Sequence, residues 1–276
     1  MMYDTFHLPR FGRLLKKTLL ERPMQLFGFT GAILLILFIY YAIYHLPLPQ
    51  WIEIQKAAFL VGLTGGGSIL ASFMFGYFST NAQGSTYLSL PASHFEKWLC
   101  AVLIAGVLYP AIFLVFFRIV DASFVTWFHN HLDTTAANYK KLYDTVSIFP
   151  FDSGKALDVF TYFANYAGAM LLGSLYFNKL SFIKVALVIG GIFLSIYFIN
   201  LLIAKLVIHD VQNAFPFDSV DITVVKSSNG SQHISTEARS LDLPSEDSKI
   251  FDVLTRYFLP AALWIIAYVR LKEKEY

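Results

Sequence analysis

A serine beside three glycines, in Gly65-Gly66-Gly67-Ser68, is the nearest approach to a nucleophile in this sequence. Such a serine acts inside a membrane only when a histidine on another membrane segment removes its proton. All the histidines lie at the N-terminus, in connecting segments or at the edges of apolar segments: His7, His45, His94, His129, His131, His209 and His233. An intramembrane hydrolase is therefore a minor alternative, and close helix packing explains the glycines better.

The sequence also gives no support for a metal site or for nucleotide hydrolysis. His129 and His131 are two residues apart, so they share a side only on an extended segment, and no carboxylate cluster accompanies them. Gly154-Lys155-Ala156 lacks the Ser or Thr that follows the lysine of a phosphate-binding loop. Cys100 is the only cysteine, which excludes an intrachain disulfide and a cysteine metal cluster. The sequence predicts no enzyme and no cofactor.

The composition is that of a membrane protein. Hydrophobic residues make up 56% of the 276 residues and charged residues 14%, and the mean hydropathy is +0.56. Apolar segments about 20 residues long cross a bilayer as helices, because lipid offers no partner to backbone groups. Six segments qualify, at 24–46, 57–78, 98–120, 160–177, 185–207 and 250–269. The predicted fold class is all-α, a polytopic membrane protein with a six-helix transmembrane bundle over 24–269.

An amphipathic helix precedes the first span, within residues 1–23. Its apolar side contains Phe11, Leu14, Leu15 and Leu19, and its polar side contains Arg13, Lys16, Lys17 and Glu21. Such a helix lies at the membrane interface, with its basic side toward anionic headgroups. A short charged tail, 270–276, follows the last span.

Two larger loops separate the spans, at 121–158 and 209–249. Both contain Phe-Pro-Phe-Asp, at 149–152 and 215–218, and these copies are candidates to fill apolar pockets above the bundle. Within the second loop, residues 221–226 predict a short strand, followed by a turn at 227–230.

The charge distribution predicts the orientation. Six spans place both termini on one side, together with 79–97 and 178–184. These segments contain 11 of the 21 Lys and Arg residues and 5 of the 19 Asp and Glu residues, in roughly half the length of the opposite loops. We expect a bacterial inner-membrane, multi-pass protein with both termini in the cytoplasm. The net charge of +2 is too small to indicate a nucleic-acid partner.

The span centres contain no Asp, Glu or Arg, which disfavours a carrier driven by protons or sodium. Their polar side chains include Asn165 and Asn200, the candidate polar residues of a substrate pathway. A transport protein of this kind would take its energy from a partner.

The loop between the second and third predicted spans has features that favour the docking of a partner protein. Ser93-His94-Phe95-Glu96 predicts a capping box that starts the third helix, and Pro91 interrupts any helix before it. Residues 81–90 can then form a separate short element that presents Tyr87, Leu88 and Leu90 near the aqueous side. The alternative is that these side chains pack on the inner ends of the spans.

The segment from Tyr87 to Ser93, Tyr-Leu-Ser-Leu-Pro-Ala-Ser, followed by Glu96-Lys97, resembles a signature between spans two and three of type-2 ABC exporter permeases. More specifically, the chain resembles six-span permease-like proteins of Bacteroidetes-type bacteria, and Tyr268 to Glu275 resembles their charged tail. Many members have Arg where this chain has His94. The resemblance implies a homodimer or heterodimer of permease subunits, energised by a separate ATPase subunit. It also places Tyr87, Leu88, Leu90, Pro91, Ser93, Glu96 and Lys97 at the ATPase-coupling interface.

The leading functional hypothesis is therefore a transmembrane permease subunit of an ABC-type exporter. Glycines of the second and fifth spans would form close helix contacts: Gly65, Gly66, Gly67, Gly190 and Gly191. The alternative is a non-transporting membrane scaffold or sensor whose large outer loops bind a ligand or an envelope partner.

Overall fold

A computed structural model of the chain describes residues 5–44, 51–135, 139–152, 154–177, 180–207, 211–214, 219–227, 234–242 and 245–274. The chain forms two compact units. Unit 1 comprises Met1–Phe182 and Pro260–Tyr276, and unit 2 comprises Ile183–Leu259.

The first half of unit 1 is a series of helices, several of which are joined by π-helical turns rather than by loops. In chain order these elements are α1 (Leu8–Glu21), η1 (Met24–Gly28), α2 (Phe29–Tyr44), α3 (Trp51–Leu60), η3 (Val61–Gly66), α4 (Gly67–Phe73), the 3₁₀ turn η4 (Gly76–Ser79) and α5 (Asn81–Leu88). Pro23 stands between α1 and η1, where it removes one backbone donor and bends the chain.

The second half of unit 1 contains a long continuous helix, since α6 (His94–Val102), η5 (Leu103–Leu108) and α7 (Tyr109–Asn130) follow one another without a break. After it come α8 (Tyr139–Thr145) and α9 (Gly154–Tyr176), and α12 (Leu259–Lys272) ends the chain. Residues 121–130 of the expected outer loop thus belong to the third helix.

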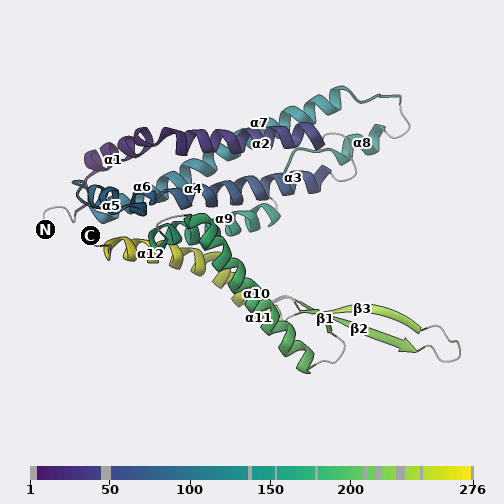
Figure 1. The fold of residues 1–276 in the computed structure, drawn as a ribbon. Helices are drawn as coiled ribbons and strands as arrows, with labels where there is room; N and C mark the ends of the chain where they lie inside the picture. Colours follow the sequence, from purple (N-terminus) through teal and green to yellow (C-terminus); the bar gives the residue numbers. More distant parts are fainter. Residues whose placement is uncertain are drawn as a thin grey trace. The chain divides into compact units, whose positions relative to one another are not determined.

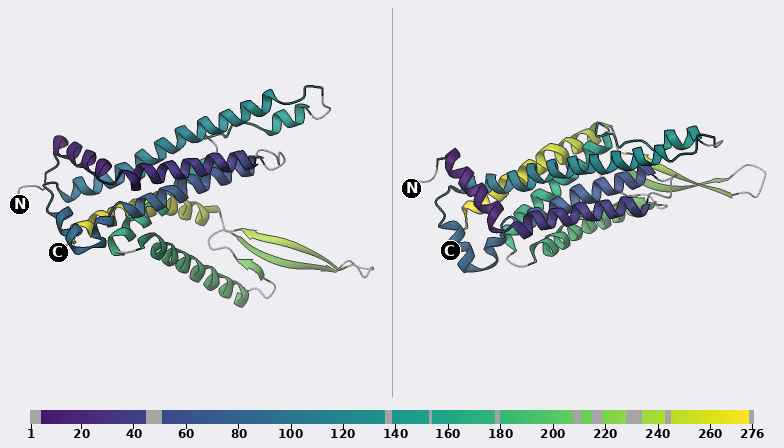
Figure 2. Two further views of the ribbon diagram at one scale, coloured as in Figure 1. Left: turned by 45° about the horizontal axis from the view of Figure 1, so that its top comes forward. Right: turned by 90° about the horizontal axis from the view of Figure 1, so that it is seen from above.

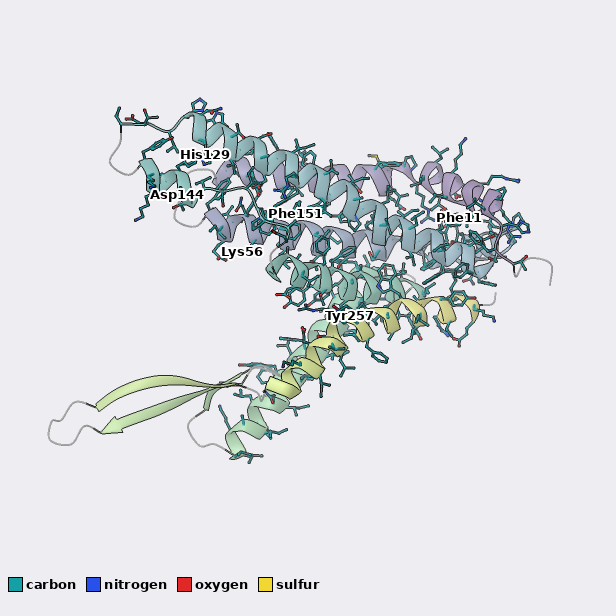
Figure 3. The ribbon with its side chains drawn as sticks, turned by 180° about the vertical axis from the view of Figure 1, so that it is seen from behind. Phe11, Lys56, His129, Asp144, Phe151 and Tyr257 are labelled. Carbon is teal, nitrogen blue, oxygen red and sulfur yellow. The ribbon has the colours of Figure 1, made fainter. Side chains whose placement is uncertain are left out.

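Helix α9 is largely covered by its neighbours in unit 1. It packs against α4 and η3, and Ala167, Leu171 and Leu175 are completely buried on it. Figure 1 shows α2 beside α7, with α4, α9 and α12 following one another across the unit. Figure 2 shows α1, α5 and the C-terminal end of α12 at the same end of the unit. In Figure 3, Phe11 lies at that end, and His129 and Asp144 lie at the other.

Unit 2 contains most of α10 (Ser181–Val207), three strands, α11 (Ser245–Val253) and η6 (Leu254–Phe258). The strands β1 (Val211–Ala214), β2 (Ser219–Ser227) and β3 (Ile234–Asp242) form an antiparallel sheet in the order β1-β2-β3. The register of β2 and β3 runs from Ser219 opposite Asp242 to Ser227 opposite Ile234. The predicted strand at 221–226 lies inside β2, so unit 2 adds a small sheet to the predicted all-α bundle. The β-branched residues Val220, Ile222, Thr223, Val224 and Val225 favour β2.

Five helices in the described part of the chain are long and apolar enough to cross a membrane: Met24–Ile43, Trp51–Phe73, His94–Asn130, Ser181–Val207 and Lys249–Lys272. They indicate a multi-pass helical membrane protein. The expected span at 160–177 falls in α9, which is not among them. Polar and small residues such as Thr161, Asn165 and Gly168 lower its hydropathy, and a helix enclosed by other helices needs less apolar surface toward lipid.

Candidate docking site at the turn between α5 and α6

Helices α5 and α6 are separated by a short turn that contains Pro91. The Thr80 side chain caps α5 by accepting a hydrogen bond from the Gln83 amide. Helix α6 begins with the predicted capping box: Ser93 Oγ accepts from the Glu96 amide at 3.1 Å, and Glu96 Oε2 accepts from the Ser93 amide at 2.9 Å. The start of each of the two helices is therefore fixed by a nearby side chain, and the capping box also fixes the end of the turn at Ser93.

Glu96 also attaches the N-terminal helix to this turn. Its carboxylate is fully buried and accepts the His7 amide at 2.8 Å, Arg10 Nε at 2.7 Å and Arg10 Nη2 at 2.8 Å. The two bonds from one guanidinium form the bidentate pairing that fixes both position and orientation. The capping carboxylate thus determines where α1 begins relative to α6.

Lys97 of α6 forms a second connection, to the C-terminal end of α5. Its side chain is 1% exposed, and Nζ donates to the Leu88 carbonyl at 2.9 Å. That carbonyl belongs to the last turn of α5, where a cation is favourable because the backbone carbonyls there lack helical partners. Lys97 therefore orients α5 from a buried position.

Tyr87 is buried, which corrects the expectation that it faces the aqueous side. Its ring stacks on Tyr77 with centroids 4.5 Å apart and meets Phe78 edge-on at 5.8 Å. Burial raises the pKa of the Tyr87 hydroxyl. Here the alternative, packing on the inner ends of the spans, holds.

The seven residues expected at the interface therefore divide into two groups. Leu88 and Leu90 are half-buried and Pro91 is exposed, so these three are accessible at the turn. The other four are buried and hold the turn in place: Tyr87, Ser93, Glu96 and Lys97. The partners His7, Arg10, Tyr77 and Thr80 were not predicted, and only the threonine gave a local signal, as a capping residue before a helix.

Two cavities open beside the turn. The larger, about 320 Å³, lies between α1, η4 and α5 and is lined by polar and basic side chains that include Lys17, Arg22, Gln83 and Thr86. The smaller, about 200 Å³, lies between α1 and the turn and is lined in part by Arg10, Arg13 and Pro91. Lys17 and Leu90 line both, so the accessible part of the turn adjoins the basic side of α1.

Glycines of the second span lie against large aromatic side chains. A Cβ at Gly66 would stand 2.0 Å from Tyr109 Oη, and one at Gly67 would stand 2.4 Å from Phe163 Cε2. Gly62, which was not predicted, would place a Cβ 2.4 Å from Phe113, and its carbonyl accepts the Tyr109 hydroxyl at 2.6 Å. Small residues here let the third and fourth predicted helices approach closely.

Three other glycines make no such contact. A Cβ at Gly65 would meet only Val61 Cγ1, at 3.9 Å, and one at Gly190 or Gly191 would meet no atom within 4 Å in the described part of the chain.

The two asparagines expected along a pathway lie in different units of the chain. Asn165, on α9 in unit 1, is half-buried and donates to the Thr161 carbonyl at 2.9 Å. Asn200 is half-buried on α10 in unit 2.

A buried carboxylate at the opposite end of unit 1 was not expected. Asp121 of α7 is fully buried and accepts Tyr41 Oη at 3.0 Å, Gln55 Nε2 at 2.7 Å and the Phe149 amide at 2.8 Å. Sequence reasoning missed it because the expected third span ended one residue earlier.

The first Phe-Pro-Phe-Asp segment fills an aromatic pocket beside this carboxylate. Phe149 packs on Phe59 and Phe117 with centroids 5.0 and 5.7 Å apart, and the Arg118 guanidinium lies 4.1 Å from the Phe151 ring centroid. Figure 3 shows Phe151 within the bundle. The second copy, at 215–218, lies outside the described residues.

The described residues offer no catalytic or metal-binding constellation. Ser68 is buried, and no hydrogen bond joins it to a histidine. His129 Nε2 and His131 Nδ1 hydrogen-bond to the carbonyls of Val146 and Trp127. No group of three His, Cys, Asp or Glu side chains in the described part of the chain is arranged to hold a metal ion.

Comparison with known proteins yields no relative. The chain matches no protein-family model, and no curated protein and no solved structure matches it.

Proposed function

We propose that this protein is the transmembrane permease subunit of a bacterial ABC-type exporter and that a separate ATPase subunit docks on the turn between α5 and α6. The observation that carries the proposal is the construction of this turn. Leu88, Leu90 and Pro91 are accessible, and buried hydrogen bonds of Glu96 and Lys97 hold the turn against two helices. A rigid element of this kind can transmit a displacement, caused by a conformational change in a bound partner, to the helices of the bundle.

The long third helix would carry such a displacement along the bundle. Helix α6 starts at the capping box and continues through η5 and α7 as far as Asn130. Because hydrogen-bonded helices and packed side chains are stiff, a displacement at Glu96 would reach the distant end of unit 1. Residues Ser93, Glu96 and Lys97 act as positioning residues in this proposal, and the three accessible residues make the contact.

The proposal counts six spans, with α9 as the fourth. Helix α9 has 23 residues, which is enough to cross a bilayer, and its neighbours α4 and η3 cover much of its surface. Both termini then lie on one side, and the basic residues of α1 favour the cytoplasm for that side. In this arrangement α1 lies at the cytoplasmic interface of the inner membrane.

The decisive experiment is co-purification of the tagged, full-length chain from its own host in mild detergent, followed by a measurement of ATP hydrolysis in the eluate. We expect an ATPase subunit to elute with the wild-type chain and to lose its ATP hydrolysis in a Leu90→Asp variant. Leu132→Asp is a matched control, because Leu132 is also half-buried but lies near His131 beyond the opposite end of the bundle. A stable wild-type chain that binds no ATPase would refute the proposal.

The three-stranded sheet keeps the second candidate, a scaffold or sensor, under consideration. Strand β3 has nine residues and lies at an edge of the β1-β2-β3 sheet, and an edge strand can pair with a strand of another protein. This candidate expects deletion of 209–249 to abolish function while Leu90→Asp leaves it intact.

A further inference from the structure

The cavity between α1, η4 and α5 lies at the depth of lipid headgroups. Arg22 comes two residues before the first candidate span, Met24–Ile43, and Tyr77 comes four residues after the second, Trp51–Phe73. Both residues line this cavity of about 320 Å³. A site at this depth meets the headgroups of one leaflet whichever side of the membrane it faces.

The charges of the cavity favour a singly charged anion. Lys17 and Arg22 contribute two positive charges and Glu21 contributes one negative charge, so one positive charge is left. The Glu21 carboxylate accepts the Tyr77 hydroxyl at 3.2 Å, and no ion pair joins it to Lys17 within the described residues. A phosphodiester carries one negative charge and complements this balance.

The two cations are placed to receive a phosphate. Arg22 lies with its Cζ 3.8 Å from the Tyr77 ring centroid, so the aromatic face orients the guanidinium plane. Its Nη1 donates to Gln25 Oε1 at 3.5 Å, and its other N–H groups can donate to oxygen acceptors. Lys17 is exposed and makes no hydrogen bond or ion pair to any residue that the structure describes. It can therefore turn toward an anion without breaking an existing contact.

The remaining polar side chains suit the hydroxyl groups of a headgroup. Gln83 is exposed and its amide can donate and accept, and Thr86 Oγ1 donates to the Ala82 carbonyl at 2.8 Å, which leaves its lone pairs as acceptors. Close by in sequence, Leu20 is 64% exposed and Met24 is 84% exposed, which gives acyl chains an apolar surface. Leu20 follows Lys17 by three residues, so the two lie on one side of α1.

We infer that this cavity binds the phosphodiester headgroup of one anionic phospholipid, with phosphatidylglycerol as the best match. Lys17 and Arg22 hold the phosphate, and Gln83 and Thr86 contact the glycerol hydroxyls. The site would fix α1 to the membrane next to the docking turn. This inference does not depend on the exporter function, since it needs only a membrane around the spans.

Native mass spectrometry of the full-length protein, titrated with phosphatidylglycerol or phosphatidylcholine of identical acyl chains, tests the inference. We expect one phosphatidylglycerol per chain to be retained in preference to phosphatidylcholine. Lys17→Gln should weaken that binding about fivefold, the loss of one basic contact at an anionic surface. Lys16→Gln is the matched control: it removes the same charge from the same helix, but Lys16 lines neither cavity.

Equal weakening by Lys16→Gln and Lys17→Gln would overturn the inference, because it would show charge attraction without a site. Equal retention of the two lipids would overturn it as well. A third arm adds glycerol phosphate without acyl chains: if this soluble phosphate displaces the lipid at equal concentration, the site recognises free phosphates and the lipid assignment fails. Lys17 is exposed, so its variant folds, and Arg22→Gln provides an independent second variant.

Discussion

Arg10 and Glu96, which are 86 residues apart in sequence, form a bidentate ion pair in which the carboxylate is fully buried and the Arg10 side chain is 19% exposed. The same carboxylate caps α6 through the Ser93 amide. One side chain therefore starts the third helix, fixes the docking turn and attaches α1. Loss of this group would affect three elements at once.

Replacing Glu96 with Ala should lower the free energy of unfolding by about 3 kcal/mol, because it removes the buried carboxylate that accepts from the Arg10 guanidinium and from two backbone amides. Residues 5–22 should also become sensitive to protease as α1 detaches. Denaturant titration in mixed micelles and limited proteolysis measure the two effects. The control is Glu273→Ala, which breaks an exposed pair with Arg270 and should cost less than about 0.5 kcal/mol. Equal stability of the two variants would contradict the role of Glu96.

The contrast between Ser93 and Arg10 shows what the sequence could reveal at the docking turn. The capping box spans four consecutive residues, so a short stretch of sequence was enough to predict it. The ion pair depends on how α1 packs against α6, and no spacing in the sequence encodes that distance. Tyr87 was placed wrongly for a similar reason, since its partner Tyr77 lies in a separate turn, and only the folded chain brings the two rings together.

The membrane bundle was predictable to a coarser degree. Apolar length located five of the six expected spans among the helices that can cross a membrane. It also determined where each predicted span ended, and an end placed at residue 120 hid the buried Asp121. The glycine-rich stretch correctly drew attention to the second span, yet composition could not distinguish Gly66, which meets Tyr109, from Gly65, which meets almost nothing. The strand at 221–226 was readable from its β-branched residues, whereas its partner β3 is polar and was not.

Substitution of Gly66 by Ala should destabilise the protein by about 1–3 kcal/mol, because a Cβ there would stand 2.0 Å from Tyr109 Oη and would push that ring away from the Gly62 carbonyl. Gly65→Ala is the matched control one residue earlier, where the nearest atom would be 3.9 Å away. The control should be neutral or stabilising by up to about 1 kcal/mol, since Ala is the better helix former. Thermal unfolding of both variants in the same detergent measures the difference. Similar melting temperatures would show that this contact does not constrain the bundle.

Asp121→Ala should destabilise the opposite end of unit 1 by about 3 kcal/mol or more, because it removes the buried carboxylate that accepts from the Tyr41 hydroxyl, the Gln55 side-chain amide and the Phe149 backbone amide. Asp121→Asn should be milder, since one amide oxygen still accepts. Hydrogen exchange at residues 146–151 should rise in both variants as Phe149 and Phe151 lose their packing. The exposed Asp133 provides the control, and Asp133→Asn should leave that exchange unchanged.

The pKa of Tyr77 should make the end of unit 1 that contains α1 and α5 sensitive to alkali. Burial first, and the Glu21 carboxylate second, raise this pKa from 10.0 to about 12, while Arg22 opposes the change. Because the folded state favours the neutral phenol, its stabilising contribution is complete below pH 10 and is lost as the pH rises toward about 12. Absorbance titration of the wild type and of Tyr77→Phe should therefore give no difference in phenolate signal up to about pH 11, one unit below that pKa. A difference that develops near pH 10 would show that the Tyr77 hydroxyl is open to water.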